Sequence, residues 1–239
     1  MTKHNFIYLN EVNSTNTYLL DNDLPTGTVL STGKQLAGRG RSGRVWESHK
    51  GDNLMFSMIL PTIPIDKLFL SQIVAGCSIV DTLRQYADVR LKWPNDVVCN
   101  SKKLVGMLIE TRFSGNKLQK AVLGVGINVH SMPESLSAKA TALHLITDKA
   151  IPPLKELLES AVANIDLAFD RFLNNDVDIS AQWADYSACL MKTIAFHRGG
   201  VVEGVTEIGI QPDGSLIVRR ADGGTDVISE GEIGYDFRF

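Results

Sequence analysis

The chain has 239 residues, 44% of them hydrophobic, and a formal net charge of −3 at pH 7. That length suits one large domain, or one domain with a small appendage, and is ample for a sizeable core. The near-neutral charge argues against a protein that coats nucleic acid through its overall field, so any anion binding must come from a local cluster.

The larger, N-terminal part of the chain mixes predicted strands with predicted helices. Short apolar runs predict strands at residues 5–9, 27–35, 53–60, 89–96, 103–111 and 118–129. Pro94 must stop the fourth of these strands, and residues 112–117 predict a hairpin loop between the last two. Cap-type residues before Tyr18 predict a helix start, and apolar residues at helical spacing predict helices at residues 65–87 and 152–175.

Composition changes after about residue 189, where β-branched residues and regular turn signals begin. The turn residues at 212–214 and 222–224 lie between alternating apolar runs, which is typical of β-hairpins. We therefore expect a large domain over residues 1–188 and a small all-β domain over residues 189–239. Because hairpin-linked strands accompany the helices, the expected fold class is α+β rather than a doubly wound parallel sheet.

The sequence contains no segment that is typical of export or of membrane insertion. The stretch "MTKHNFIYLNE" lacks the long apolar region of a signal peptide, and no apolar run approaches transmembrane length. Cys77, Cys99 and Cys189 are widely spaced, which gives neither a disulfide framework nor a metal-ligand spacing. We expect buried thiols in a soluble, cytoplasmic protein with no membrane partner, and we assign no metal ligands.

The stretch "GRGRSGRVW" at residues 38–46 contains the G-x-G-x-x-G spacing of dinucleotide-binding loops. That motif needs a helix to open immediately, so that the helix N-terminus meets the pyrophosphate. Val45 and Trp46, which come soon after Gly43, are a poor helix start, and the dinucleotide interpretation is therefore disfavoured. No G-K-[ST] ends the segment, so it is not a Walker A loop either.

The glycines and arginines of this loop together suit an anionic ligand. Glycines leave the backbone mobile when the loop is empty, and arginines supply planar, permanently charged donors that match phosphate or carboxylate groups. Such a loop could fold over an anion, close the site and expel water. The alternatives are an exposed, solvated basic turn and an RGG-like nucleic-acid segment, although such segments usually repeat in disordered tails.

Four further stretches help to decide whether this loop binds an anionic ligand or is a solvated basic turn or a nucleic-acid segment. They are "STN" at residues 14–16, "KWPND" at 92–96, "KLVGMLIE" at 103–110 and "GVGIN" at 124–128. The first offers hydroxyls and an amide at a helix start, and the second offers polar residues after a strand. In the third a lysine opens a strand, and the third and fourth contain strand glycines that a ligand can approach closely. Each stretch alone also fits an ordinary helix cap, a turn or a lysine that protects a strand end.

Taken in order, the five segments resemble the biotin–protein ligase family, and the match runs from about residue 8 to 130. The resemblance implies a mixed-sheet catalytic domain of the biotin/lipoate ligase type, followed by a small SH3-like β-barrel. It implies an enzyme that activates biotin with ATP as biotinyl-AMP, with Mg²⁺ bridging the phosphates. Biotin would then pass to a lysine of a biotin carboxyl carrier protein. A lipoate or octanoate enzyme of the same fold and a non-catalytic biotin or nucleotide binder are the alternatives.

The resemblance also assigns site residues. Lys103 and Arg41 would be the catalytic groups, because fixed cations stabilise the charge that develops between two anions. Biotin would be bound by Ser14, Thr15, Asn16, Gln35, Gly38, Arg39, Gly40, Arg41, Lys103 and Gly106. ATP would be bound by Arg39, Arg41, Arg44, Trp46, Lys92, Asn95, Gly126 and Asn128. Trp46 would pack under the loop, and a plain core aromatic is the alternative there.

The sequence departs from the family pattern at both ends. Family motifs begin almost at residue 1, which leaves no room for the N-terminal winged-helix domain with which some members repress transcription. We therefore expect no repressor function and no nucleic-acid partner. In the tail "GEIGYDFRF", Gly234 replaces the usual serine and Arg238 comes late, so no ATP contact is assigned there. A sheet edge could pair two protomers as a homodimer or dock the carrier.

Overall fold

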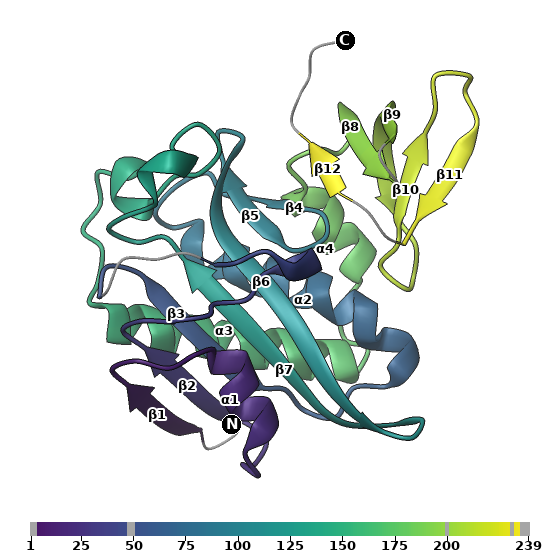
Figure 1. Ribbon diagram of the computed structural model, residues 1–239. Coiled ribbons are helices and arrows are strands. Elements are labelled where there is room, and N and C mark those ends of the chain that lie inside the picture. Colours follow the sequence, from purple (N-terminus) through teal and green to yellow (C-terminus); the bar gives the residue numbers. More distant parts are fainter. Residues whose placement is uncertain (1–3, 47–50, 199–200, 230–231, 235–239) are drawn as a thin grey trace.

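The structure is a computed structural model that describes residues 4–46, 51–198, 201–229 and 232–234. The start of the N-terminal stretch, the segment directly after Trp46 and Arg238 of the tail lie outside these ranges. The described residues form a seven-stranded mixed sheet with helices on both faces, and a five-stranded C-terminal sheet (Figure 1). The α+β class expected from the sequence is confirmed.

The large sheet has the order β1-β2-β3-β7-β6-β5-β4. The first two strands pair in parallel, and all other neighbours in it pair antiparallel. Each predicted strand is present; the one at residues 89–96 is β4, which ends before Pro94, and the short strand β5 that follows Pro94 was not predicted. The strands are β1 (Asn5–Leu9), β2 (Thr28–Thr32), β3 (Leu54–Ile59), β4 (Arg90–Lys92), β5 (Asp96–Cys99), β6 (Lys102–Ser114) and β7 (Lys117–Ile127).

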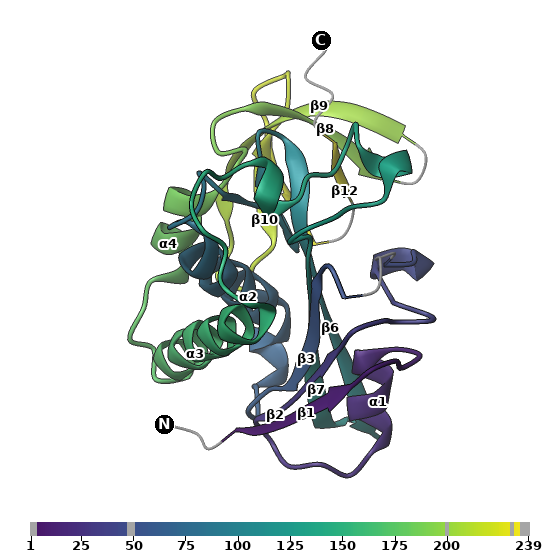
Figure 2. The ribbon, with the colours of Figure 1, turned by 90° about the vertical axis from the view of Figure 1, so that its left-hand side faces the viewer.

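Helices cover the two faces of this sheet unequally. Figure 2 shows α2 (Leu68–Leu83), α3 (Leu154–Leu173) and α4 (Ile179–Tyr186) on one face and α1 (Thr15–Asp21) on the other. The sequence did not predict α4, which is short and is capped by the Asp178 carboxylate accepting from the Ala181 N–H at 3.0 Å. Helix α2 is buried almost all round because it lies between the sheet and α3. Within the described ranges, no helix combines the length and the apolar composition that crossing a bilayer requires.

The C-terminal sheet is antiparallel, with the order β11-β10-β9-β8-β12. Both predicted hairpin turns are present, the first before β10 and the second before β11. The strands are β8 (Thr193–Arg198), β9 (Val201–Ile210), β10 (Leu216–Arg219), β11 (Thr225–Ile228) and β12 (Glu232–Gly234). Buried residues of this sheet and of the large sheet belong to one continuous core. The domain boundary at residues 188 and 189 stays a prediction.

A turn at residues 212–214 attaches the C-terminal sheet to the rest of the molecule. The Trp93 indole N–H donates to the Gly214 carbonyl at 3.0 Å, and both groups are buried. Gly214 has φ +93°, and a Cβ on it would lie 3.0 Å from the Leu70 backbone in α2. Only glycine combines that backbone conformation with so close an approach. The turn therefore packs directly against the hairpin that carries Trp93.

Glu207 on β9 is a buried carboxylate in the same junction. The Ser187 hydroxyl donates to its Oε1, and Oε2 has no hydrogen-bond partner among the described residues. Burial raises the pKa of Glu207 to about 7, although the Ser187 hydrogen bond and the Lys192 charge both oppose the rise. Ser187 also accepts the backbone N–H groups of Cys189 and Leu190, both at 3.1 Å, so the carboxyl group supports the chain between α4 and β8.

Glu207→Gln is expected to remove a pH dependence of stability. Below the ordinary pKa of 4.5 both folded and unfolded states hold the proton, and no penalty exists. Between pH 4.5 and about 7 the unfolded state ionises while the folded state keeps its proton, so wild-type stability falls over this interval by on the order of 3 kcal/mol. The glutamine side chain of the variant is uncharged at both low and high pH, so this pH dependence is absent. Urea unfolding at about pH 5 and about pH 8 measures the difference.

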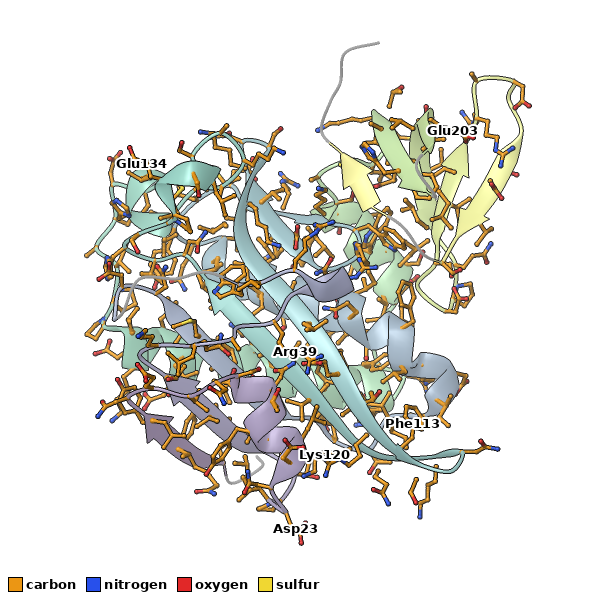
Figure 3. All side chains as sticks on the ribbon, viewed as in Figure 1. Asp23, Arg39, Phe113, Lys120, Glu134 and Glu203 are labelled. Atoms are coloured by element: carbon orange, nitrogen blue, oxygen red, sulfur yellow. The ribbon has the colours of Figure 1, made fainter. Side chains whose placement is uncertain are left out.

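Glu203→Gln is the matched control, since Glu203 is an exposed carboxylate on the same strand (Figure 3). It is expected to keep the wild-type pH dependence. A Glu207→Gln protein that loses stability between the two pH values as steeply as wild type would contradict the prediction.

Candidate active site

A cavity of about 330 Å³ opens on the face of the large sheet that carries α1. Its wall comes from the start of α1, the loop at residues 39–46, the β4–β5 turn, the first half of β6, the end of β7 and the segment at residues 133–140. The predicted site residues that line it are Ser14, Thr15, Asn16, Gln35, Arg39, Gly40, Arg41, Arg44, Trp46, Lys92, Asn95, Lys103, Gly106, Gly126 and Asn128. Gly38 does not line the cavity. It supports the loop, because its carbonyl accepts the Trp46 N–H at 3.0 Å.

The start of α1 presents a connected set of polar side chains. Ser14 caps the helix, and its hydroxyl accepts the Thr17 N–H at 3.4 Å. The Gln35 carbonyl oxygen accepts the Thr15 backbone N–H at 2.9 Å and lies 3.2 Å from the Thr15 hydroxyl. The sequence placed these residues 20 positions apart at one predicted site, and the structure brings them into contact.

Trp46 lies flat against the glycines of two paired strands. Gly106 and Gly126 are direct partners in the β6–β7 ladder. A Cβ on Gly126 would lie 2.4 Å from the Trp46 ring, and one on Gly106 would lie 2.8 Å from it. The indole N–H is buried and has no hydrogen-bond partner among the described residues. Both interpretations, packing beneath the loop and a plain core aromatic, fit these contacts, and the role of Trp46 stays a prediction.

Cations dominate the charged groups that line the cavity. Arg39, Arg41, Arg44, Lys92 and Lys103 line it, and Asp96 is the one carboxylate among the described lining residues. The Lys103 ammonium lies 2.8 Å from the Asp96 carboxylate and 5.7 Å from the centre of the Trp46 ring. Burial lowers the pKa of Lys92, with Asp96 opposing the shift and Lys103 and Arg44 adding to it. The cavity therefore favours an anionic ligand.

Asn95 and Asn128 line the cavity, and their side chains also form hydrogen bonds with the backbone of neighbouring segments. Asn95 donates to the Met107 carbonyl at 2.9 Å, and its side-chain oxygen accepts from Arg41 Nη1 at 3.3 Å. Asn128 donates to the Thr141 carbonyl at 3.0 Å. Each amide is thus fixed in orientation, so its polar atoms can contact a ligand from one direction only.

Sequence reasoning assigned no role to four polar or glycine residues in or beside the cavity, and it did not predict that Pro133, Leu136 and Ala140 also line it. Asp96 was noted without a role, and Ser57, Glu110 and Gly124 were not singled out. The Ser57 hydroxyl lies 2.6 Å from both Thr15 Oγ1 and Asn16 Oδ1, and a Cβ on Gly124 would lie 2.4 Å from Asn16 Oδ1. A serine within the apolar run of β3 was the available signal, because a buried hydroxyl needs a partner.

Comparison with known proteins gives the family. The sequence profile of the biotin/lipoate A/B protein ligase family matches residues 8–128, which is half of the chain. The chain belongs to the biotin/lipoate A/B protein ligase family. All five segments that carried the resemblance lie within the matched residues.

Individual members of this family are similar over different lengths. The biotin–[acetyl-CoA-carboxylase] ligase of Paracoccus denitrificans is 30% identical over 213 residues, which cover 84% of this chain and 87% of that protein. The bifunctional ligase/repressor BirA of Bacillus subtilis is 38% identical over 118 residues, which cover 48% of this chain and 36% of BirA. BirA of Bacillus spizizenii is 29% identical, and the match covers 86% of this chain and 65% of that protein. The chain thus spans less than two thirds of the length of the BirA relatives.

A solved ligase has the same fold over nearly the whole chain. The biotin protein ligase of Aquifex aeolicus in complex with biotin and ATP has a TM-score of 0.82 and 29% identity. The match covers 96% of this chain and 97% of that one, so it includes the C-terminal sheet as well as the family segment.

Gly126→Ala is expected to displace Trp46 and to destabilise the fold by about 1–3 kcal/mol, because the added methyl group would lie only 2.4 Å from the indole. Displacement exposes the ring to water, so the tryptophan emission is expected to shift to longer wavelength. The same substitution in a Trp46→Phe background should give no shift. Gly209→Ala is the control, since its Cβ would meet nothing closer than 3.6 Å. An unchanged emission spectrum would contradict the packing of Trp46 on Gly126.

Proposed function

We propose that the chain is a biotin–protein ligase, which activates biotin with ATP as biotinyl-AMP and transfers biotin to a lysine of a biotin carboxyl carrier protein. The single observation that carries the proposal is the meeting of Lys103, the loop arginines and the polar start of α1 around one cavity. The similarity to a ligase crystallised with biotin and ATP over nearly the full chain supports it.

The first step needs cations and positioning rather than a base. In this step a biotin carboxylate oxygen attacks the α-phosphorus of ATP, the bond from that phosphorus to the α,β-bridging oxygen breaks, and pyrophosphate leaves with the bonding electrons. A carboxylate is already ionised near neutral pH, so no proton must be removed. The barrier comes from bringing two anions together, and holding them in place can supply roughly 7–11 kcal/mol of it.

The site residues divide between the two substrates in this proposal. The start of α1 and Gln35 would pair the donors and acceptors of biotin's neutral ring, whose burial is otherwise costly. Lys103 and Arg41 would stand between the carboxylate and the α-phosphate, where negative charge develops. The nucleotide would be bound on the side lined by Lys92, Asn95 and Asn128, and the glycines and Trp46 would shape the floor.

In the second step a lysine amine of the carrier attacks the activated acyl carbon, and AMP leaves with the bonding electrons. The neutral amine is the nucleophile, so the carrier lysine must lose a proton before or during attack. Acetyl-CoA carboxylase, named in the relatives, supplies the chemical class of acceptor. A domain that presents an exposed lysine is the partner we propose.

Mg²⁺ enters this scheme with ATP, as part of the substrate. Among the described residues there is no group of three or more metal-binding side chains, and the carboxylate that lines the cavity, Asp96, is paired with Lys103. These residues do not build a protein cage for the ion, and magnesium commonly binds through substrate phosphates with few protein ligands. No step here depends on a protein-held metal.

Location and partners are expectations that accompany the activity. A cytoplasmic enzyme is proposed, since ATP and carrier domains of this class occur there. A homodimer stays a prediction to be checked by sedimentation. Absence of operator binding also stays a prediction, because BirA relatives are both ligases and repressors; tight, sequence-specific retardation of DNA in a gel would contradict it.

Pyrophosphate exchange tests the activity and separates it from a lipoate enzyme. Exchange of labelled pyrophosphate into ATP is expected with biotin and not with lipoate. A carrier domain incubated with enzyme, ATP and biotin should then gain one biotinyl group by mass spectrometry. Exchange with lipoate alone would establish the alternative, and binding of biotin without exchange would indicate a non-catalytic binder.

Lys103→Ala is expected to lower the biotin-dependent exchange rate by about a hundredfold or more, because a fixed cation at developing charge contributes several kcal/mol. Lys102→Ala is the matched control: it is the preceding lysine of β6, its side chain is exposed, and it donates to the Ser137 carbonyl at 2.8 Å instead of facing the cavity. Near-normal exchange in the Lys103 variant would rule out the proposed role.

Arg41→Ala is expected to speed dissociation of biotinyl-AMP by about tenfold or more while changing biotin affinity much less, because a charged contact to phosphate is lost only when phosphate is present. Stopped-flow release of the adenylate and equilibrium binding of biotin measure the two effects separately. Equal losses of both affinities would contradict a role at the phosphate.

A further inference from the structure

Glu110 is a partly buried carboxylate beside the cavity that does not itself line it. It lies on β6, and its side chain is 17% exposed. Strand alternation puts it on the same face as Gly106 and Leu108, both of which line the cavity. One carboxylate oxygen, Oε2, accepts from Asn16 Nδ2 at 2.9 Å, and the other, Oε1, lies 3.2 Å from Arg39 Nη2. Two segments far apart in the sequence therefore meet at this group.

Asn16 is held from all sides, and its orientation is fixed by Glu110. It is 4% exposed. Its amide nitrogen donates to the Leu108 carbonyl at 3.2 Å as well as to Glu110, and its oxygen faces the Ser57 hydroxyl at 2.6 Å. Both amide hydrogens and an acceptor site are thus occupied. In this arrangement Asn16 positions its neighbours instead of offering a donor to a ligand.

The hydroxyls that lead to Asn16 have a defined direction. Ser57 Oγ lies 2.6 Å from both Thr15 Oγ1 and Asn16 Oδ1, and it has one hydrogen. An amide oxygen can only accept, so Ser57 donates its one hydrogen to Asn16. The Ser57 oxygen then remains as an acceptor that faces the Thr15 hydroxyl, and that hydroxyl also lies 3.2 Å from Gln35 Oε1. The donors of Ser57 and Asn16 therefore point toward the carboxylate of Glu110. A charged acceptor at the end of such a chain strengthens and orients every bond before it.

Arg39 connects the loop to the same carboxylate. The loop is a small hairpin, in which Gly40 N–H donates to the Arg44 carbonyl at 2.8 Å and Arg39 bridges to Val45. Figure 3 shows Arg39 in front of the sheet, beside α1. Its side chain is 55% exposed, so its guanidinium contacts the rim of the network rather than a buried pocket. The ion pair fixes one arm of the loop against β6.

We propose that Glu110 is a positioning residue that holds both the polar start of α1 and the arginine–glycine loop in their ligand-ready places, with Arg39 acting as the loop's contact to it. This inference rests on the proposed ligase function for its consequences, while the placement itself concerns the unliganded protein. It changes two assignments: Asn16 positions its neighbours instead of binding biotin directly, and the Arg39 side chain secures the loop, which leaves Arg41 as the loop arginine for the phosphate.

A second ion pair on the same elements provides the matched control. Arg112, two residues beyond Glu110 on β6, pairs with Asp21 at 2.5 Å, at the far end of α1. Both partners are largely exposed, and neither contacts the loop. Asp21→Asn and Glu110→Gln remove the same charge from the same helix–strand contact, at opposite ends of α1. Only the second is expected to affect the loop.

Amide hydrogen exchange of the unliganded protein is the first test. In Glu110→Gln, residues 38–46 and the start of α1 are expected to exchange roughly two- to fivefold faster, as loss of a partly exposed ion pair predicts. Exchange in α2 and α3 should not change. Asp21→Asn should leave residues 38–46 unchanged. Wild-type exchange of the loop in Glu110→Gln, or equal acceleration in both variants, would overturn the inference, whatever the protein's activity.

Arg39→Met identifies the route from Glu110 to the loop. It is expected to accelerate exchange at residues 38–46 and to leave the start of α1 unchanged. The double variant Arg39→Met/Glu110→Gln should accelerate the loop no more than Glu110→Gln alone, because both changes break one contact. Additive acceleration would show that Glu110 acts on the loop by another route and would overturn the role given to Arg39.

Ligand measurements give a readout that a purely structural role would not move. At unchanged melting temperature, Glu110→Gln is expected to weaken biotin binding and to speed adenylate release, by roughly two- to fivefold each. Arg39→Met should speed adenylate release alone. If wild type forms no adenylate, the proposed function fails and the exchange experiment alone decides the positioning role. If wild type forms it and Glu110→Gln retains both affinities, the positioning role fails instead.

Discussion

The site depends on glycines at three places where two central strands come close to other groups. Gly106 and Gly126 are paired across β6 and β7, and any side chain on either would occupy the space of the Trp46 ring. Gly124, one position along the same face, leaves the space that Asn16 fills. A helix start and a loop can therefore approach the sheet within contact distance. With ordinary side chains at these positions the sheet face would be filled, and the polar groups of α1 and of the loop would have no common cavity.

Those glycines also decide how the cations are held before a ligand arrives. Because Trp46 and Lys103 share the space above Gly106, the ammonium lies over an aromatic ring and beside Asp96, not in bulk water. Arg41 faces the neutral oxygen of Asn95, and burial disfavours charge on Lys92. A cluster of positive groups in partly desolvated surroundings costs free energy, and an anionic ligand relieves that cost. Relief of this repulsion therefore adds to the hydrogen bonds that an anionic ligand would form in the cavity.

Local sequence signals predicted most of the elements, whereas the connections of the site depend on tertiary contacts. Turn residues such as Pro94 and Gly214 mark their turns in any context. The strands that flank such turns are recognised from apolar runs and from the alternation of apolar and polar residues. The contact of Arg39 with Glu110 and that of Ser57 with Asn16 join segments far apart in the sequence, and only the register of β3, β6 and β7 brings them together. The five ordered segments revealed the site through resemblance. They did not reveal which polar side chains face a ligand and which are already used by neighbours.

The C-terminal sheet supports the site without lining it, as far as the described residues go. Its turn accepts the Trp93 indole N–H through Gly214, and Trp93 immediately follows Lys92 in the short hairpin that also carries Asp96. On the other side of that hairpin, the Ala188 N–H donates to the Leu91 carbonyl at 2.8 Å, in the segment that Glu207 holds through Ser187. A hairpin of three-residue and four-residue strands at the edge of a sheet has few bonds of its own. Fixed from both sides by the small sheet, it can keep a lysine, an amide and a carboxylate in place against the charge of the loop.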